Sequence, residues 1–264
     1  MSSLTFVLPT TRAIRYVVPL REGGSLPGIV EAEDLGTWVL KFRGAGQGVK
    51  ALVAEVIVGE LARALGIRVP ELKVVELPAQ IARYEADEEV QDLLVASIGR
   101  NLGVDLLPSA FNYDPARPPT AEVAAQILWL DAYTANIDRT PHNPNLLRWH
   151  GNTWCIDHGA ALYFHHSWPS RGTDPARFAA QKFDASTHVL RPVARGLVPI
   201  HERFAATIAE PMLRRVLELV PDEWLETAMG PGNLSDPVGV RSIYVEHLLA
   251  RMATPSPWLP QDPS

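Results

Sequence analysis

The feature that most constrains the fold is a polar, proline-rich segment that directly follows a long apolar run. The run 121–136, "AEVAAQILWLDAYTAN", has the apolar spacing of a buried helix, and Thr120 and Glu122 suit its start. The segment that follows, "IDRTPHNPNLL", sets two prolines and two asparagines after Asp138. A strand pattern at 153–159, "TWCIDHG", then ends with Asp157 shortly before a glycine. This order predicts that one helix end, one polar loop and one hairpin bring their oxygen-bearing side chains to a common site.

Composition limits the class of protein. The chain has 264 residues, 47% of them hydrophobic, which is enough for one large domain or two packed lobes. Its net charge of −6 argues against coating nucleic acid or anionic membrane. The apolar runs are broken by charges and no leader follows Met1, so we expect a soluble, cytoplasmic protein with no membrane or nucleic-acid partner. The single cysteine, Cys155, allows no internal disulfide and is expected in the core.

The first part of the chain is rich in strand patterns and contains one strong helix pattern. Turn signals at "REGGSLPG" and around Gly36 separate the first three strands into an antiparallel meander. The expected strands lie at 14–20, 28–34, 37–42, 71–77 and 92–98, and the expected helix lies at 48–66. After Thr120 the pattern is a helix, a hairpin around "HGN" and then loops and helices.

This order predicts an α+β fold in two lobes. Residues 1–100 form a small antiparallel-sheet lobe with one main helix, and residues 101–255 form a larger, mostly helical lobe. A short connection is expected near Gly99 to Gly103, and 256–264 is expected to be a flexible tail. A cleft between two such lobes is a common place for a ligand.

Lys41 is the most informative cation. Only four of the 24 basic residues are lysines, and Lys41 sits in the apolar strand "WVLKF". A strand lysine that points into a cleft can bind phosphate, and it needs a carboxylate to hold its flexible stem. Glu55, a charge on the mostly apolar helix, can do this, whereas Glu60 points to another helix face. The alternative is that Lys41 only solubilises an edge strand and Glu55 lies on the surface.

The loop and the hairpin supply the remaining groups of a phosphoryl-transfer site. Such a site needs a carboxylate for the attacking hydroxyl, and an amide oxygen with a second carboxylate for magnesium. Asp138, Asn143 and Asp157 occur in that order. Each of them alone can be an ordinary turn residue. Together with Lys41 and Glu55, they favour a site that binds nucleotide and metal.

These motifs resemble the HipA-like kinases, bacterial relatives of the protein-kinase-like fold, and more distantly the phosphatidylinositol kinases. The likeness lies in "NIDRTPHNPNLL", "IDHG" and the preceding "VLKF" and "AEVIVGELARALGI", and extends from about Arg15 to about Leu225. It implies a two-lobed kinase fold that uses ATP and Mg²⁺. It also implies that the strand lysine and helix glutamate pair over the nucleotide, that Asp138 is the catalytic base, and that Asn143 and Asp157 bind the metal.

The chain also departs from that pattern. Thr140 stands where these relatives often have histidine, and His158 follows the metal aspartate where protein kinases have phenylalanine. Little sequence precedes Arg15, so we expect the extra N-terminal subdomain of the HipA toxins to be missing. We therefore expect neither toxin activity nor an antitoxin partner from the resemblance.

Two glycine-rich segments and two apolar residues complete the expected nucleotide contacts. Gly23, Gly24 and Ser25, in the first turn, can cradle phosphates with backbone N–H groups, although a plain hairpin turn is an equal alternative. Ala96 and Ile98 are assigned to the cofactor site, just before the expected connection. The second segment, "GAGQGVK", follows a strand and opens a helix, but it matches neither the dinucleotide fingerprint nor the P-loop. It remains a weak indication of a phosphate contact at Gly46, Gly48 or Lys50.

We therefore expect an ATP- and Mg²⁺-dependent phosphotransferase that acts on a hydroxyl group, with protein serine or threonine among the acceptors. Its catalytic residues are Asp138, Lys41 and Glu55. One alternative is an inactive, kinase-shaped module that binds nucleotide or a partner protein. Another is a dinucleotide-binding oxidoreductase built on "GAGQG". The acceptor and the oligomeric state cannot be read from the sequence.

Overall fold

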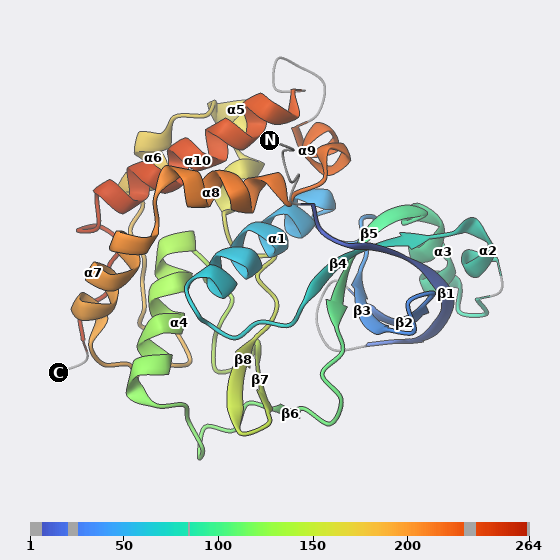
Figure 1. Cartoon of the computed structure of the whole chain (residues 1–264), viewed down its shortest axis with the longest axis horizontal. Coiled ribbons are helices and arrows are strands. Elements are labelled where there is room, and N and C mark those ends of the chain that lie inside the picture. The colour runs from blue at the N-terminus through green and yellow to red at the C-terminus, as the bar shows by residue number, and fades with distance from the viewer. Residues whose placement is uncertain (1–6, 21–25, 84, 230–235, 263–264) are drawn as a thin grey trace, which may run out of the picture.

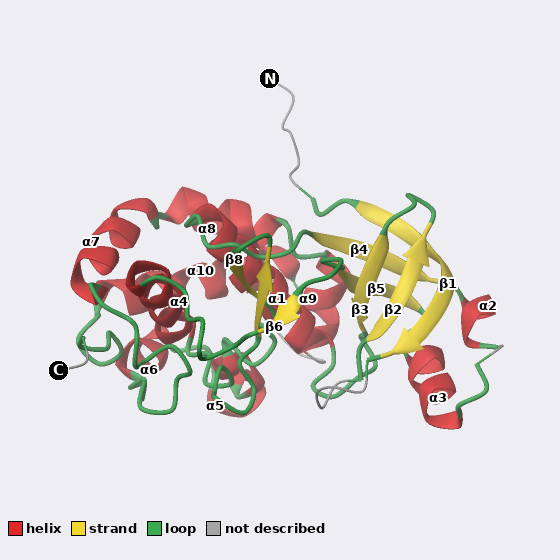
Figure 2. Cartoon of the chain, turned by 90° about the horizontal axis from the view of Figure 1, so that it is seen from below, coloured by secondary structure: helices red, strands yellow, loops and turns green. Residues whose placement is uncertain are grey.

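The computed structural model describes residues 7–20, 26–83, 85–229 and 236–262. Five strands form a barrel at one end of the molecule, and most helices gather at the other end (Figure 1). Figure 2 shows the same separation from below, with α2 (Ala79–Ala82) and α3 (Glu88–Ala96) beside the barrel. The expected division into a sheet-rich part followed by a helical part is confirmed.

The barrel consists of five strands in the order β1-β2-β3-β5-β4. All neighbouring pairs are antiparallel except β1 with β4, a parallel pair that closes the barrel. Side chains that are almost fully buried fill the interior, as the alternating pattern of half-buried strands requires. The strands are β1 (Thr10–Pro19), β2 (Gly28–Ala32), β3 (Thr37–Lys41), β4 (Leu72–Leu77) and β5 (Gly99–Asp105).

Helix α1 (Val49–Ala64) connects the two parts physically. It follows Gly48, whose φ of 66° suits glycine, and it is buried on nearly every face. In Figure 1 it lies between the barrel and α8 (Glu210–Glu218). Its buried side chains share one core cluster with β4, β5 and the helical part, so α1 holds a fixed position relative to both.

The centre of the helical part is α4 (Ala121–Thr134). Thr120 caps its start by accepting a hydrogen bond from Val123 N, and Ala135 ends it in the left-handed region. Helix α10 (Pro237–Ala253) packs against it, and buried Arg251 donates to the carbonyl of Ala132 at 2.8 Å. The carboxyl end of α4 is therefore held in place, and the polar loop with Asp138 begins there.

The remaining elements surround this centre. The hairpin around "HGN" is confirmed as β7 and β8, which form a small sheet with β6. Among the described residues, no helix is long and apolar enough to cross a membrane. The further elements are β6 (Phe111–Asn112), β7 (Leu146–Trp149), β8 (Asn152–Cys155), a 3₁₀ helix (Tyr163–His166), α5 (Trp168–Arg171), α6 (Pro175–Ala180), α7 (Leu197–Thr207) and α9 (Asp222–Met229).

Two expectations around residue 100 are wrong. The segment 92–98, expected as a strand, belongs mostly to α3, which Asp87 caps through Glu89 N and Val90 N. Short apolar runs do not distinguish helix from strand, and the acidic residues ahead of this run are a helix-start signal. Gly99 to Gly103, expected as the connection, form most of β5 inside the barrel. We therefore propose that the boundary between the lobes follows Asp105 instead of residue 100.

Residues 256–262, expected as a flexible tail, pack against the helical part instead. Trp258 is 1% exposed, and its ring meets that of Trp129 edge to face at 5.6 Å between centroids. The carboxylate of Asp262 accepts hydrogen bonds from Gly196 N and Leu197 N at the start of α7. The prolines of this segment suggested disorder, but its single tryptophan outweighs them by burying a large apolar surface.

We predict that Trp258→Ala lowers the free energy of unfolding by about 3–5 kcal/mol, because it leaves a cavity beside Trp129 and removes a buried aromatic contact. Urea unfolding followed by circular dichroism measures this change. Val198→Ala, at a side chain that is 49% exposed on α7, is the control and should change stability by less than about 0.5 kcal/mol. Equal stability of the Trp258 variant and the wild type would contradict the packing described here.

Candidate active site

Three charged side chains from three distant segments meet between the barrel and the helical part. Lys41 Nζ, at the end of β3, donates to Glu55 Oε1 on α1. It also donates to Asp157 Oδ1, just after β8, at 2.8 Å. The expected pairing of Lys41 with Glu55 is therefore present, while Glu60 pairs with Arg63 on another face. Exposure rises outward from 3% for Glu55 and 15% for Lys41 to 44% for Asp157, so the cluster opens to solvent at Asp157.

The charges of this cluster perturb one another strongly. Burial alone would lower the pKa of Lys41, but the two carboxylates outweigh it and raise that pKa, so the ammonium is retained. Lys41 in turn holds the pKa of Asp157 well below its usual range. Burial raises the pKa of Glu55, and the charge of Asp157 adds to this effect. One ammonium faces two carboxylates, so the cluster carries one net negative charge when both carboxylates are ionised.

The backbone around Asp157 is shaped for this meeting. Asp157 has a φ of 57°, in the left-handed region that aspartate tolerates better than most residues. Gly159 lies so close to α1 that a Cβ at this position would stand 3.2 Å from Glu55 Oε1. Glycine therefore lets the loop approach α1 closely enough for Asp157 to reach Lys41.

Asp138 lies in the loop after α4 and is held by two amides. Its Oδ2 accepts hydrogen bonds from Asn143 Nδ2 at 2.8 Å and from Asn145 Nδ2 at 3.2 Å. Asn136 Oδ1 accepts a hydrogen bond from the backbone N–H of Asp138 at 3.1 Å. Within the described residues, Oδ1 of Asp138 accepts no hydrogen bond, so this second carboxylate oxygen is available to a ligand. The structure brings Asp138 and Asn143 together as the sequence predicted.

A fully buried ion pair anchors this loop to the core. Arg139 Nε donates to Asp131 Oδ2 at 2.6 Å, and both side chains are 0% exposed. Arg139 also donates to the carbonyl oxygens of Asn145 and Ile156, which precede β7 and Asp157. Thus one guanidinium ties the end of α4, the polar loop and the aspartate-bearing segment together. The side chain of Arg139 is buried and points into the core, so it is not placed to neutralise a phosphate.

Two further side chains complete the polar network around Asp131. His188 Nδ1 accepts from Leu190 N, so its Nε2 carries the hydrogen and donates to Asp131 Oδ2 at 2.9 Å. Asn136 Nδ2 donates to Asp131 Oδ1 at 3.0 Å. Sequence reasoning missed the contact between Asp131 and His188. The sequence signal that could have found Asp131 is its position as the single acid in the apolar helix "QILWLDAYTA". Glu55 was identified from a signal of the same kind.

The histidine after Asp157 belongs to the same buried region. His158 Nδ1 lies 3.4 Å from Arg139 Nη2, and the side chain is 3% exposed. Burial, together with the charge of Arg139, lowers the pKa of His158 to about 3. The imidazole is therefore neutral at neutral pH. Cys155 is also buried, and burial raises the pKa of its thiol to about 12, as expected of an unreactive core residue.

Other sequence-predicted contacts are not part of this cluster. Gly23, Gly24 and Ser25 lie outside the described residues. Ala96 and Ile98 lie at the Gly99 end of β5, opposite the end from which the chain continues to the helical part, and Ile98 is 42% exposed. No hydrogen bond or ion pair in the described part of the chain joins either of them to Lys41, so their contact with a nucleotide stays a prediction.

The second glycine-rich segment has a structural role in this chain. Lys50 donates to the carbonyl oxygen of His165 at 2.9 Å, and Gly46 and Gly48 form the turn into α1. A dinucleotide fold needs a parallel, doubly wound sheet. The barrel is antiparallel in all pairs but one, so the oxidoreductase alternative is wrong.

The architecture is similar to that of solved kinases. The Helicobacter pylori proinflammatory kinase CtkA matches with a TM-score of 0.51 and 11% identity, over 92% of this chain and 98% of that protein. The Golgi casein kinase, solved with Mn and ADP bound, gives a TM-score of 0.48 and 11% identity over 93% of this chain and 73% of its own. No curated protein sequence gives a significant match. The likeness to CtkA shows that the fold is protein-kinase-like.

The sequence of residues 14–259 matches the HipA-like kinase family. This match spans both the barrel and the helical part, and it includes every residue of the Lys41 cluster and of the Asp138 loop. The chain belongs to the HipA-like kinase family, as the resemblance of its motifs suggested.

We predict that His158→Gln makes stability less sensitive to acid. The pKa of His158 is about 3 in the folded protein and about 6.5 when unfolded. Between these values only the unfolded state binds the proton, so the free energy of unfolding falls as pH is lowered. Between pH 7 and pH 4, the wild type should lose about 3 kcal/mol more than His158→Gln.

Chemical unfolding at a series of pH values tests this prediction. His150→Gln, at an exposed position in the β7–β8 turn, is the matched control and should follow the wild type. Parallel pH profiles for the wild type and His158→Gln would show that His158 is not held neutral by its surroundings.

Proposed function

We propose that this HipA-like kinase transfers the γ-phosphate of ATP to a hydroxyl group in a reaction that depends on Mg²⁺. The observation that carries the proposal is the cluster of Lys41, Glu55 and Asp157, which faces solvent at Asp157 and contains more carboxylate than ammonium. A lysine held by a buried glutamate is a fixed positive charge suited to phosphate. A carboxylate at the open end suits a divalent cation.

The residues present fit a magnesium ion that is shared with a nucleotide. Mg²⁺ is commonly bound by one or two carboxylates, with phosphate and water oxygens as further ligands. No group of three or more acidic, histidine or cysteine side chains in the described part of the chain could hold a metal by itself. We propose Asp157 and Asn143 as its protein ligands. When bound, the ion neutralises charge on the phosphates.

Asn145 is a second candidate for the amide ligand. The backbone carbonyl oxygen of Asn145 accepts a hydrogen bond from Ile156 N at 3.1 Å, so Asn145 lies beside the segment that carries Asp157. Asn143 is exposed, while Asn145 is 9% exposed. Both donate Nδ2 to Asp138, which leaves the amide oxygen of each for a cation. Comparing metal affinity in Asn143→Ala and Asn145→Ala distinguishes them.

Asp138 is the proposed catalytic base. In phosphoryl transfer a carboxylate accepts the proton of the attacking hydroxyl and orients that group toward the phosphorus. The two amides on Oδ2 fix the orientation of Asp138 and leave its second oxygen for the acceptor. Lys41, held by Glu55, would contact the phosphates. The acceptor is a hydroxyl compound, with protein serine or threonine as the first class to test.

We predict that Asp138→Asn lowers phosphate transfer by about a hundredfold to ten-thousandfold, because the amide cannot accept the proton, while ATP binding is retained. Transfer is measured as label moved from γ-labelled ATP to the protein itself and to serine-containing peptides, together with ADP release. Asp92→Asn, at an exposed position on α3, makes the same charge change far from the loop and should retain full activity.

Two outcomes would contradict this assignment. Unchanged turnover in Asp138→Asn would remove Asp138 from the mechanism. ATP binding by the wild type without transfer to any hydroxyl acceptor and without ADP release would favour the kinase-shaped binding module instead.

A further inference from the structure

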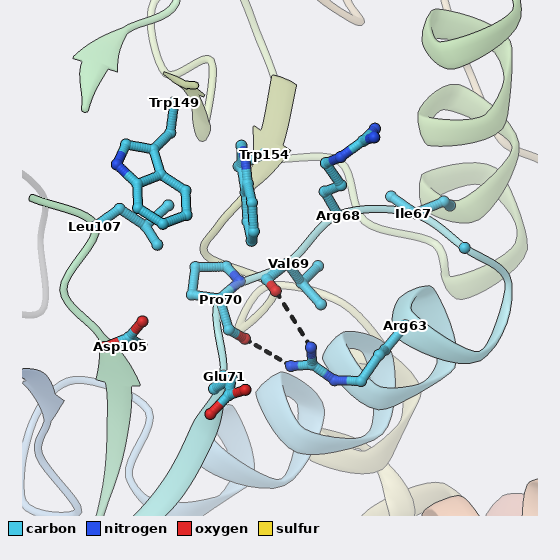
Figure 3. A pocket seen from close by; sticks show the side chains of 11 residues that line it. Arg63, Ile67, Arg68, Val69, Pro70, Glu71, Asp105, Leu107, Trp149 and Trp154 are labelled. Carbon is cyan, nitrogen blue, oxygen red and sulfur yellow. Dashed lines mark hydrogen bonds between the residues drawn. The ribbon is translucent and has the colours of Figure 1, made fainter. Parts of the chain in front are cut away.

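A pocket that contains no residue of the Lys41 cluster lies where three parts of the chain converge. It has a volume of about 390 Å³. Its walls come from the segment between α1 and β4, from the chain that follows β5, and from the β7–β8 hairpin (Figure 3). None of the proposed catalytic or metal-binding residues contributes to it. The side chains relevant to its chemistry are Trp149, Trp154, Leu107, Pro70, Asp105 and Glu71.

The aromatic wall of the pocket is fixed in place. The rings of Trp149 and Trp154 meet edge to face with centroids 5.1 Å apart. Trp149 Nε1 donates to the carbonyl of Pro108 at 2.9 Å, which ties the hairpin to the connection between the lobes. Indole faces attract cations, and arginine stacks on them especially well. The stem of a long cationic side chain can also pack against Leu107 and Pro70.

Uncompensated negative charge lies in the same pocket. Asp105 is partly buried, and within the described residues its carboxylate accepts no hydrogen bond and forms no ion pair. Burial raises the pKa of Asp105, and the neighbouring charge of Glu71 raises it further. The charge of Lys73 lowers the pKa of Asp105, but Lys73 itself forms an ion pair with Asp34 at 2.5 Å. A partly buried carboxylate without a partner is unfavourable, and a cation that entered the pocket would relieve this cost.

The two arginines of the pocket do not supply that cation. Arg63 donates hydrogen bonds to the carbonyl oxygens of Val69 and Pro70, at 3.4 and 2.7 Å, and forms an ion pair with Glu60. Arg68 is exposed, and Figure 3 places its guanidinium on the far side of the pocket from Asp105. The end of the pocket with Asp105 and Glu71 therefore remains negative.

We propose that this pocket binds an arginine side chain of a peptide segment from another protein. The stem of that arginine would lie against the two indoles, and its guanidinium would reach Asp105 and Glu71. The net charge of −6 of the whole chain favours the approach of a basic segment.

The position of the pocket gives such binding a structural consequence. Arg68 O accepts a hydrogen bond from Cys155 N at 2.9 Å, so the α1–β4 segment and β8 are joined as one structural unit. A peptide in the pocket would contact this unit and the connection between the lobes together. The inference does not depend on the proposed kinase activity, and its test uses the protein without nucleotide.

The probe is a blocked Gly-Gly-Arg-Gly-Gly peptide, and the matched probe replaces arginine by citrulline, which has nearly the same shape without the charge. Binding is followed by NMR through the indole N–H signals of Trp149 and Trp154. We expect the arginine peptide to shift these signals in a saturable manner. The citrulline peptide should bind at least about tenfold more weakly, because the charge-assisted contacts are lost.

The variants locate the binding site. Asp105→Asn should weaken the arginine peptide about tenfold or more, while the exposed Asp92→Asn, on α3, should leave its affinity unchanged. Asp105→Asn should not lower the melting temperature, since the carboxylate has no structural partner to lose. Glu71→Gln, at an exposed position, is a second variant that leaves the fold intact and should also weaken binding. Equal affinity for arginine and citrulline peptides, or unchanged affinity in both pocket variants, would overturn the proposal.

Discussion

The ion pair between Asp131 and Arg139 is the interaction on which the arrangement of the site depends. Both side chains are fully buried, so each charge has lost its water and relies on the other. Removal of one partner from such a pair costs about 3–5 kcal/mol, because the remaining charge is left uncompensated. Arg139 also holds the carbonyl oxygens of Asn145 and Ile156. The pair therefore sets where the polar loop ends and where the segment with Asp157 begins.

A second network of charged side chains joins the segment held by this buried ion pair to the barrel. Asp157 follows Ile156 directly and reaches Lys41 on β3, which Glu55 on α1 holds from the other side. The barrel, α1 and the helical part therefore meet at one ammonium group. Since the carboxylates outnumber the ammonium, the site favours an added cation. A nucleotide with its metal would bring both the phosphates for Lys41 and the positive charge for Asp157.

Much of this arrangement could be predicted from the sequence because its residues break local patterns. Lys41 and Glu55 are charges in apolar elements, and Asp138 and Asp157 follow a helix and a strand. The structure brings Lys41, Glu55 and Asp157 into contact, as it does Asp138 and Asn143, while their catalytic roles remain proposals. The predictions that failed, the strand at 92–98 and the connection that follows it, did so for physical reasons. The run at 92–98 is too short to show a helical periodicity of its apolar residues. Strand β5 contains two glycines and few β-branched residues, so its sequence does not look like a strand.

The buried network was harder to foresee for a different reason. His188 lies 57 positions from Asp131, and no local pattern indicates that the two side chains meet. The pocket with Asp105 likewise depends on three segments that only the fold brings together. In both cases the sequence shows residue types, while the contacts arise from tertiary packing.

The most direct test of the account is ATP binding by calorimetry, with and without Mg²⁺, for the wild type, Asp157→Asn and the control Asp92→Asn. We predict that Mg²⁺ strengthens binding by about tenfold or more in the wild type and in the control, since a charge-assisted contact supports at least this difference. Asp157→Asn should lose that gain. Absence of ATP binding by the wild type, or a full Mg²⁺ effect in Asp157→Asn, would contradict the assignment of the Lys41 cluster as a nucleotide and metal site.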